Sequence, residues 1–108
     1  MARAGVKPLW ARRARADLRK QFDHIAQDSA DAAFLVEGRV LEAVARLVDY
    51  PEIGRIGRAA GTRELPVRQT SLLIVYEIDV EFVRILHVRH MARRPTRAIR
   101  ERKSGEPL

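Results

Sequence analysis

Two histidines in one segment of the chain are the residues best suited to acid–base chemistry. His87 and His90 lie in the run from Val83 to His90, and an imidazole titrates near neutral pH, at about 6.5. On an expected strand, a separation of three positions sends their side chains to opposite faces, so they cannot share a metal ion. One interpretation is that one of them acts as a general base or as a hydrogen-bond donor to phosphate. The favoured interpretation is a half-buried histidine at the end of a strand.

Arginines offer a second kind of chemistry, the binding of phosphate. A nuclease that works without a metal needs clustered cations and a residue that accepts a proton. With His87 or His90, the arginines that supply this set are Arg63, Arg68, Arg84, Arg89, Arg93 and Arg94. These residue types alone do not establish an arrangement in space, because any basic sheet would contain them. The sequence has no nucleophile elbow, phosphate loop, dinucleotide fingerprint or metal-type carboxylate spacing, so we expect no metal and no cofactor.

The net charge of +7 is concentrated at the two ends of the sequence. Residues 1–20 contain seven Lys or Arg and one acid, Asp17, and residues 84–103 contain eight and one acid, Glu101. Residues 21–83 contain six against eleven acids. This pattern favours an anionic partner, nucleic acid or an acidic polypeptide, bound where the two ends converge. The alternative is that the arginines only keep a small protein soluble.

Length and composition indicate one small globular domain. A chain of 108 residues with 46% apolar residues has room for one core. Cysteine is absent, so no disulfide or thiolate metal site is available. The apolar runs are shorter than the roughly 18 residues of a membrane span. A cytoplasmic protein is therefore expected.

Two amphipathic helices are predicted in the first half. Ala14, Leu18, Phe22 and Ile25 share one face of a helix over about residues 11–27. Ser29 is placed to cap a second helix, which Pro51 ends, and the short link makes the two an antiparallel hairpin. The apolar stripe of the second helix is Ala33, Val36, Val40, Val44 and Leu47, flanked by Phe34, Leu41, Ala45 and Val48. That broad face predicts a well-buried helix.

The second half is predicted to form a sheet. Residues 51–61 contain three glycines and are expected to be a flexible connection. Strands are predicted at residues 62–67, 72–78 and 82–90, the last two joined as an antiparallel hairpin. Residues 5–10 are a weaker candidate for an edge strand, since Lys7 and Pro8 interrupt the pattern.

Both faces of the strand at residues 72–78 are apolar. Leu72, Ile74, Tyr76 and Ile78 fall on one face, and Leu73 and Val75 on the other. A two-helix hairpin covers only one side of a small sheet. The second side is therefore predicted to be exposed, ready for a partner, a dimer mate or a ligand segment.

Several stretches resemble the RelE/ParE superfamily of bacterial toxins. Residues 14–26 look like its A-x-x-D-L segment with an I-A ending, residues 51–55 like its P-x-x-G-R turn, and residues 61–65 like its G-x-R-E-L strand. Residues 74–76 and 85–90 look like its last two strands. The resemblance implies an α+β fold in the order strand, helix, helix and three strands, with the helical hairpin packed on one face of a small antiparallel sheet. It implies a single toxin domain over residues 1–95 and a basic, partly disordered tail over residues 96–108.

Departures from the pattern distinguish two branches of that superfamily. RelE-type toxins cleave messenger RNA on the ribosome, and their pattern has a catalytic arginine in the central strand. This sequence has Leu73 at the matching position. No tyrosine follows Tyr76 and no histidine follows His90. The sequence is more similar to ParE-type toxins, which implies a non-enzymatic inhibitor of growth that poisons DNA gyrase. For the ribonuclease alternative, the catalytic candidates are His87, His90 and Arg93.

The resemblance also implies a protein partner. A cognate antitoxin of this type is expected to wrap an extended, partly acidic C-terminal segment around the toxin. That segment would fold on binding, cover the second face of the sheet and neutralise the basic ends. The antitoxin would form a heteromeric toxin-antitoxin complex linked to the stress response, with a toxin dimer as a further option. The residues expected to contact target or antitoxin are Arg12, Arg13, Arg63, Leu73, Val75, Arg84, Arg89, Arg93 and Arg94. A plain basic nucleic-acid-binding module remains a third hypothesis.

Overall fold

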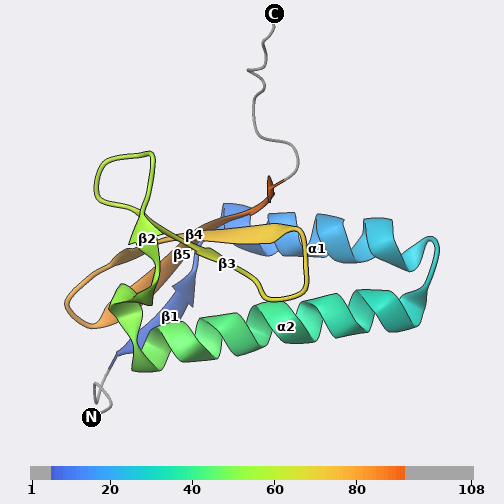
Figure 1. The fold of residues 1–108 in the computed structure, drawn as a ribbon, viewed down its shortest axis with the longest axis horizontal. Helices are drawn as coiled ribbons and strands as arrows, with labels where there is room; N and C mark the ends of the chain where they lie inside the picture. The colour runs from blue at the N-terminus through green and yellow to red at the C-terminus, as the bar shows by residue number, and fades with distance from the viewer. Residues whose placement is uncertain (1–5, 92–108) are drawn as a thin grey trace, which may run out of the picture.

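Two helices and a five-stranded sheet make up the described part of the chain (Figure 1). The structure is a computed structural model and describes residues 6–91. The elements are β1 (Lys7–Trp10), α1 (Arg12–Ala26), α2 (Ala30–Asp49), a short 3-10 helix η1 (Pro51–Ile53), β2 (Arg55–Ile56), β3 (Arg63–Pro66), β4 (Leu72–Ile78) and β5 (Phe82–His90). The predicted α+β fold is confirmed. The tail predicted at residues 96–108 lies outside the described residues.

The sheet has the order β1-β5-β4-β3-β2. The three strands β3, β4 and β5 are antiparallel, and the hairpin predicted between the last two is confirmed. The edge strand considered at residues 5–10 is present as β1, but it runs parallel to β5. The sheet is therefore mixed rather than antiparallel as predicted. Both helices and three strands separate β1 from β5 in the chain, so no tight turn dictates an antiparallel pairing.

The connection predicted to be flexible is ordered. Within residues 51–61, η1 follows α2 directly, and Arg55–Ile56 pair with β3 as a fifth strand. Gly57 N–H donates to the Thr62 carbonyl at 2.8 Å and closes the β2–β3 loop. The prediction from the glycines was wrong, because Gly54 and Gly57 permit close backbone approach and Gly61 adopts a positive φ of 80° in the turn. A Cβ on Gly57 would lie 2.3 Å from Thr62 Oγ1.

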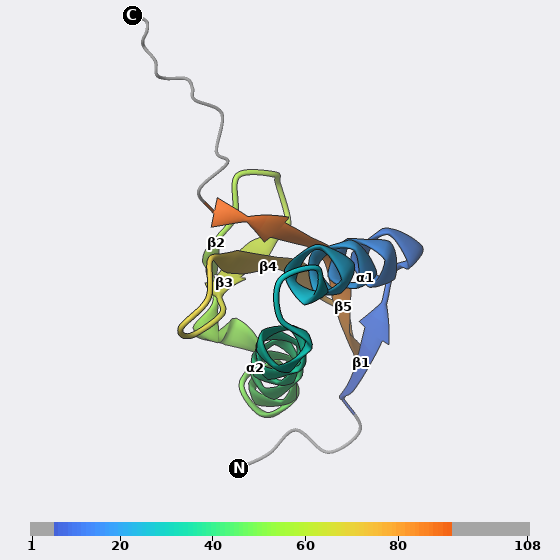
Figure 2. The ribbon, with the colours of Figure 1, turned by 90° about the vertical axis from the view of Figure 1, so that its right-hand side faces the viewer.

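The helical hairpin follows the prediction closely. The Ser29 hydroxyl accepts a hydrogen bond from Ala32 N–H at 3.1 Å, so the predicted cap of α2 is confirmed. Along the predicted stripe, Val40, Val44 and Leu47 are buried in the core. Figure 2 looks along the hairpin and shows α1 beside β5, with α2 next to it.

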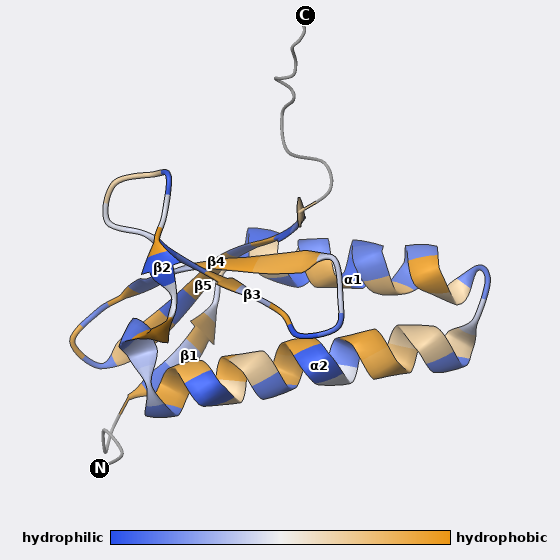
Figure 3. Cartoon of the chain, viewed as in Figure 1, coloured by the Kyte–Doolittle hydropathy of each residue, from blue (hydrophilic) through white to orange (hydrophobic). Residues whose placement is uncertain are grey.

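The prediction that α2 is well buried on a broad face is wrong. Phe34 is 63% exposed and Leu41 50%, and Ala45 is also exposed. Leu35, the next residue along the chain after Phe34, is 58% exposed. Figure 3 shows orange, apolar segments repeated along α2, whereas α1 is mostly blue. The narrow sheet covers one stripe of α2, and the second stripe faces away from it.

The main core lies between the hairpin and one face of the sheet. Leu72, Ile74 and Tyr76 of β4 meet Val83, Ile85 and Val88 of β5 there. The other face is less open than predicted, because Leu73 is 1% exposed and Val75 is half-buried. Within residues 6–91, no helix is long and apolar enough to cross a membrane.

Candidate functional site

The edge of β5 changes partner halfway along the strand. Strand β1 pairs with β5 only from Phe82 to Ile85, and Ala11 N–H donates to the Ile85 carbonyl at 2.8 Å before α1 begins. On the other side, Val75 pairs with His87 and Tyr76 with Ile85, so Leu86 is an extra residue on β5. Such a bulge bends a strand and re-aims the side chains that follow it. His87 is the first of these.

Asp17 on α1 takes the place of the missing strand partner. One oxygen, Oδ2, accepts the Val88 N–H at 3.0 Å and lies 2.5 Å from His87 Nδ1. The side chains of Asp17 and His87 are 21% and 23% exposed. The carboxylate therefore ties α1 to the sheet edge and fixes the plane of the imidazole at the same time. Because a carboxylate only accepts hydrogen bonds, Nδ1 carries the proton.

Arg13 lies one helical turn before Asp17 and completes a three-residue cluster. Its Nη2 is 3.4 Å from His87 Nε2. A guanidinium only donates hydrogen bonds, so in this contact Nε2 is placed as the acceptor while Nδ1 faces Asp17. The Arg13–His87–Asp17 cluster thus places an imidazole nitrogen and a guanidinium side by side near the surface. Sequence reasoning selected Arg13 and His87 but missed Asp17, although it is the lone acid among residues 1–20.

His90 is in different surroundings. It lines a cavity of about 360 Å³ with Gln21, His24, Ile25, Val36, Thr70, Ser71 and Leu72. Its Nδ1 is buried, and no partner for it is found among the described residues. The structure therefore keeps His90 away from the cluster that holds His87. In the part of the chain described, no three His, Cys, Asp or Glu side chains are placed to hold a metal ion.

The arginines predicted to bind phosphate or a partner differ in their exposure and in their contacts within the chain. Arg63 donates from Nη1 to the carbonyls of Gly54 (2.8 Å) and Glu52 (3.2 Å), and Arg84 pairs with Glu77 and Asp79. Arg12 is exposed at the start of α1, Arg68 is exposed, and Arg89 is half-buried on β5. Arg93 and Arg94 lie outside the described residues. Arg63 and Arg84 are therefore held by groups of this chain.

A buried network around Tyr76 was not foreseen. The phenol donates to the Pro51 carbonyl at 2.6 Å and accepts from Gly54 N–H at 2.9 Å. Burial raises the pKa of Tyr76 above its ordinary value of 10.0, while the Gly54 hydrogen bond and the Arg63 charge act in the opposite direction. The P-x-x-G spacing of Pro51 and Gly54 holds both bonding groups at the two ends of η1.

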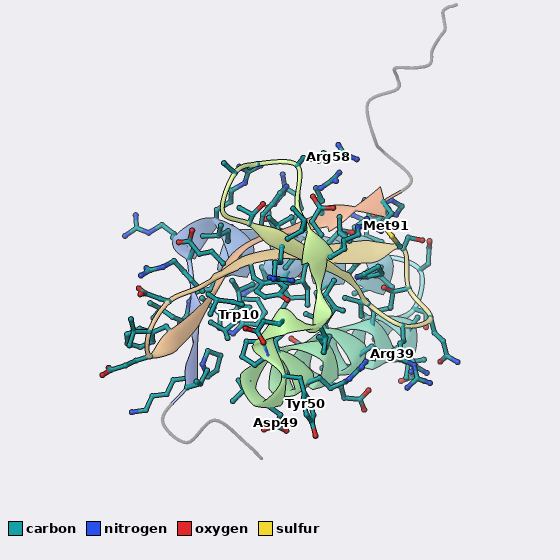
Figure 4. All side chains as sticks on the ribbon, turned by 60° about the vertical axis from the view of Figure 1, so that its left-hand side comes forward. Trp10, Arg39, Asp49, Tyr50, Arg58 and Met91 are labelled. Carbon is teal, nitrogen blue, oxygen red and sulfur yellow. The ribbon has the colours of Figure 1, made fainter. Side chains whose placement is uncertain are left out.

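Glu64 organises the β2–β3 loop from inside. Its side chain is 6% exposed, and its two oxygens accept from Arg55 Nη2 at 3.3 Å and from Arg58 N–H at 3.2 Å. Arg58 itself lies at the far end of the loop, away from the body of the protein (Figure 4). We define the Tyr76 network as Pro51, Gly54, Arg63, Glu64 and Tyr76. Its polar groups stabilise the fold and leave little for a ligand.

The outer face of the hairpin contains the second candidate site, a groove of about 480 Å³. Its apolar side chains are Trp10, Leu18, Phe22, Phe34 and Leu41, and its charged side chains are Arg15, Arg19, Asp23 and Glu37. Phe22 and Phe34 pack edge to face with ring centroids 5.0 Å apart. An open apolar groove with a charged rim is the form of site that receives an amphipathic helix. We call it the hairpin groove.

Comparison with known proteins places this geometry in a family. Residues 9–95 match the family model described as the ParE toxin of the type II toxin-antitoxin system, parDE. A protein of Sinorhizobium fredii named "Putative toxin Y4kP" is 39% identical over 80 residues, covering 72% of this chain and 83% of the relative. Toxin RelE2 of Caulobacter vibrioides is 39% identical over 85 residues, covering 79% and 94%.

Two solved structures resemble the fold. A chain from the chromosomal ParDE system of P. aeruginosa superposes with a TM-score of 0.73 at 21% identity, over 80% of this chain and 96% of that one. A chain from the RelBE2 toxin-antitoxin complex of Mycobacterium tuberculosis superposes with a TM-score of 0.55 at 28% identity, over 83% and 93%. The element order, the sheet and the two helices are therefore those of a known class of toxin.

Proposed function

Because the chain belongs to the ParE toxin family of type II toxin-antitoxin systems, we propose that it inhibits bacterial growth by poisoning DNA gyrase. The observation that carries this choice of target is Leu73. The RelE-type resemblance expects a catalytic arginine at this position, and here an apolar side chain stands there with 1% of its surface exposed. No cation can act from that point of the sheet. A non-enzymatic inhibitor is therefore part of this proposal.

The test is gyrase supercoiling of relaxed plasmid in the presence of the purified chain. Loss of supercoiling with cleaved DNA trapped on the same gel is the expected result. A parallel translation reaction with ribosomes and messenger RNA is the discriminating arm. Ribosome-dependent cleavage that is lost in His87→Ala, with gyrase unaffected, would replace the gyrase proposal with RelE-type ribonuclease activity.

We further propose that a cognate antitoxin neutralises the toxin by laying an amphipathic helix in the hairpin groove. The sequence analysis assigned this contact to the second face of the sheet, but Leu73 is buried on that face, whereas Phe34 and Leu41 are exposed on the hairpin. Exposed cations on the rim, such as Arg19 at 80% exposure, suit acidic positions on the partner. In such grooves, a few large apolar side chains carry most of the binding energy.

Three substitutions test the antitoxin groove. Phe34→Gln and Leu41→Gln remove apolar anchors while keeping reasonable helix propensity. Each is expected to weaken binding of the purified antitoxin by roughly 30-fold, the equivalent of about 2 kcal/mol. The matched control is Val80→Gln, because Val80 is 89% exposed on the β4–β5 turn and does not line the groove. Equal affinities for all three variants, measured by calorimetry, would exclude the groove as the docking site.

A further inference from the structure

The Arg13–His87–Asp17 cluster has more components than its structural role requires. Asp17 alone satisfies the Val88 N–H at the sheet edge. That capping does not require the imidazole or the guanidinium, yet His87 Nε2 and Arg13 Nη2 meet at the surface. The 3.4 Å contact between them is long, and therefore weak enough for an incoming ligand to replace.

The charges of the cluster select an anion. A metal ion bound to Nε2 would lie against the Arg13 guanidinium and be repelled by it. An oxyanion meets the opposite situation, because it accepts from the guanidinium and from Nε2 once that nitrogen is protonated. Asp17, on the far side of the ring, compensates the charge of the imidazolium. From β4, the residue paired with His87 is Val75, which carries no charge.

We propose that Arg13 and His87 form a binding site for a backbone phosphate of nucleic acid, with Asp17 as the positioning residue. The tetrahedral phosphodiester offers separate oxygens to the two donors, whose directions differ. The strongly basic chain, with a net charge of +7, favours nucleic acid over an isolated anion. This contact is independent of the gyrase proposal, because it requires only nucleic acid and the toxin.

The first measurement is DNA binding by the full chain across a series of salt concentrations. Arg13→Gln is expected to lower affinity roughly fivefold at low salt and to reduce the slope of log K against log salt by about 1. His87→Gln is expected to weaken binding as well, because it removes the second donor to the phosphate. The control, Arg58→Gln, removes the same charge from the β2–β3 loop, at the opposite edge of the sheet from β1. Equal losses for Arg13→Gln and Arg58→Gln would overturn the proposal.

The second measurement needs no substitution, so it holds even where a variant fails to fold. The ring nitrogen resonances of His87 in the wild type are followed by NMR as a short DNA duplex, inorganic phosphate or polyglutamate is added. A shift of Nε2 toward the protonated form with the duplex is expected. A response to phosphate alone would make this a free-phosphate site, and a response to polyglutamate alone would make it a protein contact. Either result, or none with the duplex, would refute the assignment to nucleic acid.

Discussion

The Tyr76 network and the hairpin groove use their side chains in opposite ways. In the network, a phenol, a carboxylate and a guanidinium each form hydrogen bonds with backbone groups. In the groove, Phe34 and Leu41 are turned outward with half or more of their surface exposed. Polar residues that looked functional in the sequence thus stabilise the fold, and apolar residues that looked like core are left for a partner. Substitutions in the first region should cost stability, and those in the second should cost binding.

The largest effect on stability is expected from Gly54→Ala. A Cβ at this position would lie 2.5 Å from the Tyr76 hydroxyl, 2.7 Å from its ring and 3.0 Å from the Glu64 carbonyl. The buried ring or the β3 backbone must shift, at a cost of about 3 kcal/mol. The matched control is Gly38→Ala, because the added Cβ meets nothing within 4 Å on α2 and should stabilise the helix by about 1 kcal/mol. Chemical denaturation of both variants decides the point, and similar stabilities would contradict the packing argument.

Tyr76→Phe tests the hydrogen bonds of the network without changing its packing. It leaves Gly54 N–H and the Pro51 carbonyl without their partner, and we expect a loss of about 2 kcal/mol. The folded-state pKa of Tyr76 lies above its value in the unfolded chain, so unfolding is favoured once the unfolded chain alone can ionise. The contribution of Tyr76 is therefore complete below about pH 10 and is lost as the pH rises through its folded-state pKa. Urea denaturation at a series of alkaline pH values should show a decline that Tyr76→Phe lacks.

Glu64→Gln and Asp23→Asn compare a buried with an exposed carboxylate. Glu64 is 6% exposed and holds Arg55 and Arg58 N–H, so the loss of its charge should cost about 1–2 kcal/mol. Asp23 pairs with Arg19 at 61% and 80% exposure, and its replacement should change stability by less than about 0.5 kcal/mol. Thermal unfolding of the two variants side by side gives the difference. If Asp23→Asn is the more destabilising substitution, burial does not explain the contribution of Glu64 to stability.

The sequence predicted the fold better than the site, for physical reasons visible in particular residues. The spacing of apolar residues and the helix-capping residues were enough to predict both helices and the strands at Leu72–Ile78 and Phe82–His90, because each of these patterns is local. The direction of β1 and the Leu86 bulge depend on contacts between distant segments, and no local pattern encodes them. Arg63 could not be recognised as structural, since its acceptors are carbonyls brought close by η1. Asp17 was missed because its partners, His87 and Val88, are about seventy residues away.

The smallest effect on stability is expected where the sequence suggested a large one. Leu41 belongs to the apolar flank of α2, and a core leucine would lose about 2 kcal/mol or more on conversion to a polar residue. At 50% exposure, Leu41→Gln removes little buried surface and should change the free energy of unfolding by less than about 0.5 kcal/mol. Val40→Ala, one position earlier and fully buried, is the contrasting substitution and should cost about 2 kcal/mol. A loss above about 1 kcal/mol for Leu41→Gln in urea denaturation would mean that the hairpin groove belongs to the core, and the division between the two regions would fail.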